Sequence, residues 1–138
     1  MLGIWSQYSS TFLFWFPVLI LVAFALPMLF APLAWAKIIR FTLPGHTDLA
    51  VYFGRSLGVA GIGICVMCFA ASKTPVAQPI VIDGLFVISV LFVITHIYGA
   101  VKKIQPLIET LEIGFWFALS CLLLAVYPVG SGTGLFGQ

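Results

Sequence analysis

Four long apolar segments constrain this chain more than any other feature of its sequence. A helix needs about 20 apolar residues to cross the hydrocarbon core of a bilayer. Runs of that length occupy roughly residues 12–35, 49–71, 80–101 and 106–127. The connections between them are short, so neighbouring helices should be antiparallel. The sequence therefore predicts an all-α integral membrane protein, a four-helix bundle that forms a single transmembrane domain over residues 1–138.

The composition agrees with a membrane protein and excludes several other classes. Charged residues make up 7% of the chain, whereas soluble domains carry about 25%. A chain this apolar cannot cover itself with polar surface, so the lipid bilayer is its predicted solvent. A net charge of +2 without a basic run gives no support to nucleic-acid binding. The three cysteines give no disulfide framework.

The first apolar run contains Pro17, Pro27 and Pro32, which should kink its helix. The tripeptide at residues 34–36 faintly resembles a signal-peptide cleavage site. However, no positive residue precedes it, and the apolar run is longer than a signal-peptide core. We therefore expect this segment to be a retained helix.

Lysine and arginine predict the orientation. The first and third connections and the start of the second helix carry most of the positive charge, in Lys37, Arg40, Arg55, Lys102 and Lys103. The second connection carries only Lys73. The positive-inside rule then predicts that both termini lie on the outer side of a bacterial inner membrane or plasma membrane. The Gly-rich end, residues 130–138, is expected to be a flexible external tail.

The second apolar run carries a stripe of small residues at steps of four and three, namely Gly54, Gly58, Gly61, Cys65 and Cys68. This spacing keeps the small residues on one narrow helix face. Membrane helices associate through such faces because their backbones can approach closely. The stripe thus favours helix packing, and a smooth wall for a lipid-like ligand is the alternative.

Four ionisable residues are predicted to lie at one depth, just below the cytoplasmic headgroups: Arg55, His96, Glu109 and Glu112. A charge at mid-bilayer costs about 2.5–3.5 kcal/mol on insertion scales. We therefore expect Arg55 to face inward and pair with Glu109 or Glu112, with His96 joining the cluster. The alternative is that these side chains reach outward to water or phosphate. Asp83 lies near the opposite end of the third helix, with Lys73 as a candidate partner.

The chemistry of this predicted cluster is open. Di-iron bundles use Glu-x-x-His motifs from two helices, which are missing here, so no metal site is expected. A histidine flanked by carboxylates could transfer protons for a lipophilic substrate. No diagnostic catalytic motif is present, and the sequence favours a role other than that of an enzyme. No cofactor is predicted, although a bound lipid or quinone-like molecule would fit such a site.

Two short motifs resemble those of DoxX-like membrane proteins. They are Arg55-Ser-Leu-Gly58-Val-Ala-Gly61-Ile-Gly63 in the second helix and Ile82-Asp83-Gly84 at the start of the third. The resemblance spans residues 49–127 and implies a four-helix bundle, in some cases a small subunit of a membrane oxidoreductase. It implies that Arg55, Gly58 and Asp83 are family-type positions. A more distant similarity is to the ergosterol-synthesis scaffold protein and to emopamil-binding-type isomerases.

Three functions follow as expectations. The first is a small accessory or scaffold subunit that packs against partner membrane proteins or forms a homo-oligomer. The second is a lipophilic-ligand-binding protein or isomerase-like enzyme that uses the predicted polar cluster. The third is an oligomeric transporter.

Overall fold

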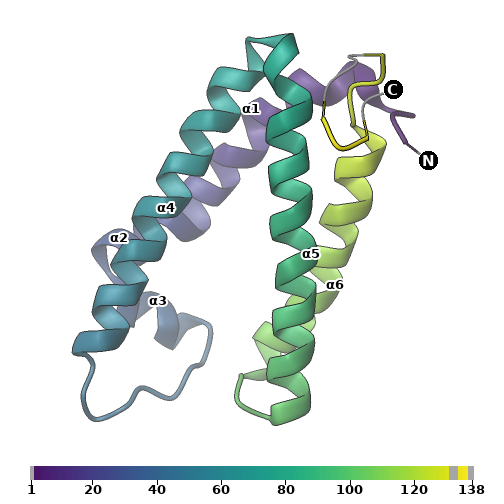
Figure 1. The fold of residues 1–138 in the computed structure, drawn as a ribbon. Coiled ribbons are helices and arrows are strands. Elements are labelled where there is room, and N and C mark those ends of the chain that lie inside the picture. The colour runs from purple at the N-terminus through teal and green to yellow at the C-terminus, as the bar shows by residue number, and fades with distance from the viewer. Residues whose placement is uncertain (1, 131–133, 137–138) are drawn as a thin grey trace.

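The computed structural model describes residues 2–130 and 134–136, which form helices and no strand (Figure 1). Within this part of the chain, helical segments long and apolar enough to cross a membrane are Ser6–Phe30, Asp48–Ser72, Pro75–Lys102 and Leu107–Ala125. The predicted all-α class is confirmed, and the four helices are long and apolar enough to cross a membrane as predicted. Length and hydropathy together indicate an integral membrane protein.

The first span is continuous through Pro17 and Pro27 but changes helix type along its length. It consists of η1 (Ser6–Tyr8), α1 (Ser9–Ile20), the wider π-helical turn η2 (Leu21–Ala25) and α2 (Leu26–Phe30). Pro27 lies in the first turn of α2 and has no backbone N–H, so the carbonyl of Ala23 loses its helical donor. The indole N–H of Trp35 donates to that carbonyl instead, at 2.9 Å.

The first span ends at Phe30, before the predicted end at residue 35. Ala31 adopts φ −140° and ψ 55°, and Pro32 begins the separate helix α3 (Pro32–Ile38). The proline ring disfavours the helical conformation of the residue before it, which explains the break at Ala31. The predicted span of residues 12–35 thus extends past the end of the first span into α3.

The remaining helices are α4 (Asp48–Ser72), α5 (Gln78–Lys102), preceded by η3 (Pro75–Ala77), and α6 (Leu107–Ala125). Most helix packing occurs within two pairs, because α1, η2 and α2 lie along α4 while α5 lies along α6. Figure 1 shows the two pairs close together at the end that carries η1 and diverging toward the opposite end. The observed bundle is therefore more open than the compact arrangement expected from the short connections.

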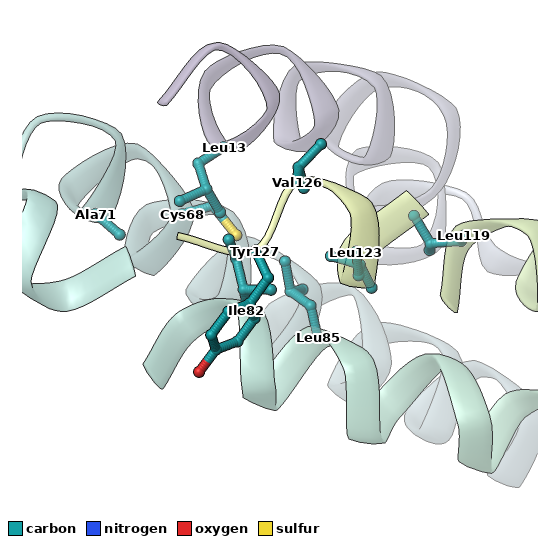
Figure 2. Packing of buried hydrophobic residues seen from close by; sticks show 9 residues of the cluster. All are labelled: Leu13, Cys68, Ala71, Ile82, Leu85, Leu119, Leu123, Val126 and Tyr127. Carbon is teal, nitrogen blue, oxygen red and sulfur yellow. The ribbon is translucent and has the colours of Figure 1, made fainter. Parts of the chain in front are cut away.

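The two pairs meet in a core near η1 (Figure 2). Its buried residues come from every span: Leu13, Cys68, Ala71, Ile82, Leu85, Leu119, Leu123, Val126 and Tyr127. Backbone hydrogen bonds also join the N-terminal segment to the end of α6, from Gly3 N–H to Leu124 at 2.9 Å and from Trp5 N–H to Ala125 at 2.8 Å. These contacts fix one end of the molecule.

The small-residue stripe of α4 is the face that packs on the first span. Gly54, Gly58, Gly61, Cys65 and Cys68 are all buried. A Cβ atom on Gly58 would lie 2.6 Å from the backbone nitrogen of Leu29 and 2.8 Å from the carbonyl oxygen of Ala25. The close approach of these two backbones thus requires glycine at residue 58.

The predicted tail, residues 130–138, falls partly outside the described residues, at 131–133 and 137–138. Its described part contacts α5. The N–H of Leu135 donates to Oδ2 of Asp83 at 2.6 Å, and the ring of Phe136 lies 5.3 Å from that of Phe86. Residues 134–136 therefore pack against the helices, in contrast to the expected free tail.

Candidate functional site

The His96–Glu109–Glu112 cluster lies where α5 ends and α6 begins. His96 occupies the second-last turn of α5, and the two glutamates occupy the first two turns of α6. The turn between the helices is tight because Lys103 adopts a left-handed conformation (φ 56°, ψ 37°) and Pro106 is the extended residue that precedes α6. The antiparallel helices consequently bring His96 opposite both carboxylates.

The geometry of the His96 ring fixes which nitrogen carries a proton. Nδ1 lies 2.7 Å from the carbonyl oxygen of Phe92. A carbonyl oxygen only accepts hydrogen bonds, so Nδ1 must be the donor. Nε2 then faces Oε2 of Glu109 at 3.1 Å and Oε2 of Glu112 at 3.5 Å. In the neutral ring, the lone pair of Nε2 points toward two carboxylates.

Neighbouring side chains orient the members of the cluster. Gln105 donates from Nε2 to the backbone oxygen of His96 and to Oγ1 of Thr110, both at 3.1 Å. Trp116 donates from its indole nitrogen to Oε2 of Glu112 at 3.1 Å. The Trp116 ring also stacks on Phe92 with centroids 4.3 Å apart. The connecting turn and both helices therefore hold the cluster in place.

Gln105 and Trp116 were not among the site residues predicted from the sequence. The signal for Trp116 was its spacing of four residues from Glu112, which places the two side chains on neighbouring positions of one helix face.

The cluster has an excess of negative charge. The side chain of His96 is 7% exposed, that of Glu109 14% and that of Glu112 32%. Even a protonated His96 neutralises only one of two ionised glutamates. Close like charges in a poorly solvated environment repel strongly. A bound proton or another cation is needed to balance the site.

Arg55 does not supply the missing positive charge. It is exposed on α4 and makes no hydrogen bond or ion pair with the residues that the structure describes. At 3.6 residues per turn, Arg55 lies about 140° around α4 from Cys68, which belongs to the core shared with α5. The prediction that Arg55 pairs with Glu109 or Glu112 is wrong, because Arg55 faces away from α5.

Two surface hollows in the described part of the chain lie away from the cluster. One of about 410 Å³ follows α4 beside Asp48, Tyr52 and Arg55. The other, about 560 Å³, lies between α1 and α6 and is lined mainly by aromatic and aliphatic side chains such as Trp15 and Leu122. Neither is lined by His96, Glu109 or Glu112. These hollows therefore give no support to a lipophilic substrate at the cluster.

Asp83 forms a separate polar feature near the other end of α5. Its Oδ2 accepts from Leu135 N–H at 2.6 Å and from the Tyr127 hydroxyl at 3.4 Å. Its Oδ1 is buried without a hydrogen-bond partner among the described residues. Lys73, the partner expected from the sequence, forms no ion pair with Asp83 in this part of the chain.

Among the residues that the structure describes, His96, Glu109 and Glu112 form a group that combines imidazole and carboxylate ligands. Candidate ligand atoms of His96, Glu109 and Glu112 all lie within 4.8 Å of one another. Imidazole nitrogen and carboxylate oxygen bind protons and also coordinate metal ions. The site can therefore exchange protons or hold a small cation.

Comparisons with family models, with curated proteins and with solved structures find no match for this chain. The DoxX-like resemblance of the α4 and α5 motifs stays a prediction from the sequence.

Proposed function

We propose that this protein is a small integral membrane protein that binds a cation, a proton or a metal ion, at His96, Glu109 and Glu112. The sequence led us to expect a lipophilic ligand at a cluster neutralised by Arg55. The proposal keeps His96, Glu109 and Glu112 as the binding residues, omits Arg55 and replaces the lipophilic ligand with a cation. The observation that carries it is the convergence of Nε2 of His96 with two carboxylates at 3.1 and 3.5 Å while Nδ1 is committed to Phe92.

A purely structural salt bridge accounts less well for the cluster. The α5–α6 pair is already joined by the tight turn, by Gln105 and by the hydrogen bond between Ser89 and Ser120 at 2.8 Å. One glutamate would suffice to pair with His96, and the second adds repulsion. Buried ion pairs also contribute little net stability, because desolvation opposes their attraction. The presence of two carboxylates beside one imidazole therefore favours a role in binding a cation.

The setting suits a small ligand. Glu112 is the most exposed of the three side chains, at 32%, so a cation can reach the cluster past it. If the positive-inside rule holds for this chain, the site faces the cytoplasm, because Lys102 and Lys103 lie at the same end of α5.

The test compares the wild type with Glu109→Gln and Glu112→Gln, each purified in detergent with a chelator. Glutamine can still accept from Trp116 and can donate to Nε2 of His96, so each variant removes charge while retaining hydrogen bonds. We expect both variants to match or exceed the wild-type Tm without added cation. A fall in pH or added Zn²⁺ should then raise Tm in the wild type alone, because binding to the folded state stabilises it.

Asp48→Asn is the matched control, because Asp48 is an exposed carboxylate on α4 outside the cluster. This variant should keep the wild-type response to cations. A marked loss of Tm in both glutamine variants before cation addition would show a structural salt bridge and contradict the proposal.

A second function, an accessory subunit in contact with other membrane helices, is favoured by a different observation. Arg55 sits in a membrane span without a partner in the described residues, and the two helix pairs diverge from their common core (Figure 1). An unpaired arginine in a membrane is costly, so a carboxylate of another chain would stabilise it. Native mass spectrometry from nanodiscs should then show an assembly that Arg55→Gln weakens, whereas a stable monomer would remove the support for this function.

A further inference from the structure

We infer that the His96–Glu109–Glu112 cluster is a site for a divalent transition metal of the Zn²⁺ type. The ligands are Nε2 of His96 and one carboxylate oxygen from each glutamate. This inference rests on the proposed cation-binding function and narrows it to one class of ion.

The spacing of the donor atoms fits such an ion. Zn²⁺ binds imidazole nitrogen and carboxylate oxygen at about 2.0–2.2 Å, which places tetrahedral ligands about 3.4 Å apart. Nε2 of His96 lies 3.1 Å from Oε2 of Glu109 and 3.5 Å from Oε2 of Glu112. The three donors all lie within 4.8 Å of one another. Small side-chain rotations would close them around one ion.

The surrounding hydrogen bonds are those of a metal site. Metal-binding histidines usually donate their second N–H to a backbone carbonyl or a carboxylate, which fixes the tautomer and orients the ring. His96 does this through Nδ1 and the Phe92 carbonyl at 2.7 Å. Ligating carboxylates are likewise hydrogen-bonded, and Trp116 donates to Glu112 at 3.1 Å. Both helices thus present their donors already oriented.

Charge balance favours a divalent ion over a proton. A neutral His96 and two ionised glutamates bring two negative charges, which one divalent cation neutralises. A single proton would leave one negative charge in a poorly solvated site.

Ligand chemistry narrows the ion further. Ca²⁺ takes six to eight oxygen ligands and Mg²⁺ strongly prefers octahedral oxygen sites, whereas imidazole suits Zn²⁺ and its neighbours. Three protein donors would leave one coordination position for water or an exogenous ligand.

The experiment uses the full chain in detergent, stripped with chelator and titrated with Zn²⁺ by calorimetry. Co²⁺ is the spectroscopic probe, because a tetrahedral site gives it a strong visible absorption. We expect a single ion per chain in the wild type. Glu109→Gln and Glu112→Gln should each weaken binding by more than about 100-fold, beyond the range of losses from outer hydrogen-bond partners. Trp116→Phe removes only an outer hydrogen-bond partner of Glu112, so it should weaken Zn²⁺ binding by about 10-fold.

His46→Gln is the matched control. His46 is the second of the two histidines in the sequence, and it lies two residues before the carboxylate of Asp48. The control should bind like the wild type. The inference is overturned if the wild type binds no stoichiometric Zn²⁺, or if the glutamine variants at residues 109 and 112 bind equally well.

The outcomes also separate the inference from the proposed function. If Zn²⁺ does not bind but acidification still raises Tm in the wild type and not in the glutamine variants, the metal assignment fails and proton binding stands. If the glutamine variants lose Tm in chelator and no cation stabilises the wild type, both fail.

Discussion

Trp35 donates its indole N–H to the carbonyl oxygen of Ala23, twelve residues earlier in the chain and 2.9 Å away. Pro27 has left this carbonyl without its helical donor. In a bilayer no water replaces a missing donor, so the side chain satisfies the broken helix. This hydrogen bond also ties α3 back to the first span.

Trp35→Phe should therefore destabilise the protein by about 1–3 kcal/mol, the usual penalty for a polar group left unsatisfied in a poorly solvated environment. The measurement is unfolding of the full chain in detergent. Trp15→Phe is the control, because Trp15 is 63% exposed and makes no hydrogen bond to the described residues. Equal losses of unfolding free energy in the two variants would show that Trp35 stabilises the protein only through the packing of its ring, without a contribution from its hydrogen bond.

Gly58→Ala tests the contact between α4 and the first span. The added methyl group would meet the backbone of Leu29 and Ala25, which cannot rotate away as a side chain can. Overpacking of this kind costs about 1–3 kcal/mol. Gly63→Ala on the same helix meets nothing within 4 Å, so it should retain the wild-type Tm. If Gly63→Ala lowered Tm as much as Gly58→Ala, the effect would come from alanine in α4 in general and not from the contact with the first span.

Tyr127 gives the protein a pH dependence at the alkaline end. Burial raises the pKa of Tyr127 above its usual range, and the adjacent carboxylate of Asp83 adds to this. A raised folded-state pKa means that the folded protein favours the neutral phenol. Its contribution is thus complete below the unfolded pKa of about 10 and is lost as pH rises through the folded pKa.

The difference in Tm between the wild type and Tyr127→Phe should therefore shrink as pH rises above about 10. Tyr52→Phe, at a tyrosine that is 66% exposed, should show no such change relative to the wild type. A difference between wild type and Tyr127→Phe that stays constant with pH would contradict this assignment.

Arg55→Gln separates the observed site from the one expected from the sequence. Arg55 has no partner in the described residues, and an unpaired arginine in a membrane is costly. The Tm of the monomer should therefore stay at the wild-type value or rise. The cation response of the His96 cluster should also be unchanged. Loss of that response would place Arg55 back at the site.

The spans were predictable because crossing a bilayer demands length and hydropathy, and both can be read from residue order alone. The break at Ala31 was only partly predictable. Pro32 was expected to kink the helix, but whether a proline bends or ends a helix depends on which donors replace the lost N–H. Trp35 replaces the donor lost at Pro27, and the helix continues past Pro27 to Phe30. At Pro32 the helix ends instead, with Ala31 outside the helical conformation.

That His96, Glu109 and Glu112 lie at one level was predictable, but the direction in which Arg55 faces was not. His96, Glu109 and Glu112 lie together because a short turn joins antiparallel helices, so their distance from the turn fixes their level. The direction of Arg55 depends instead on which face of α4 meets the neighbouring helices. The stripe at Gly54 and Gly58 packs on the first span, which leaves Arg55 on an outer face.

The most direct test of cation binding is ¹⁵N NMR of the His96 ring in the full chain, with His46→Gln used to assign the signals. We predict that Nδ1 remains protonated throughout, because it donates to Phe92. Nε2 should be the atom whose resonance shifts when Zn²⁺ is added, and this shift should be lost in Glu112→Gln. A ring protonated on Nε2 alone, with no response to Zn²⁺, would contradict the account.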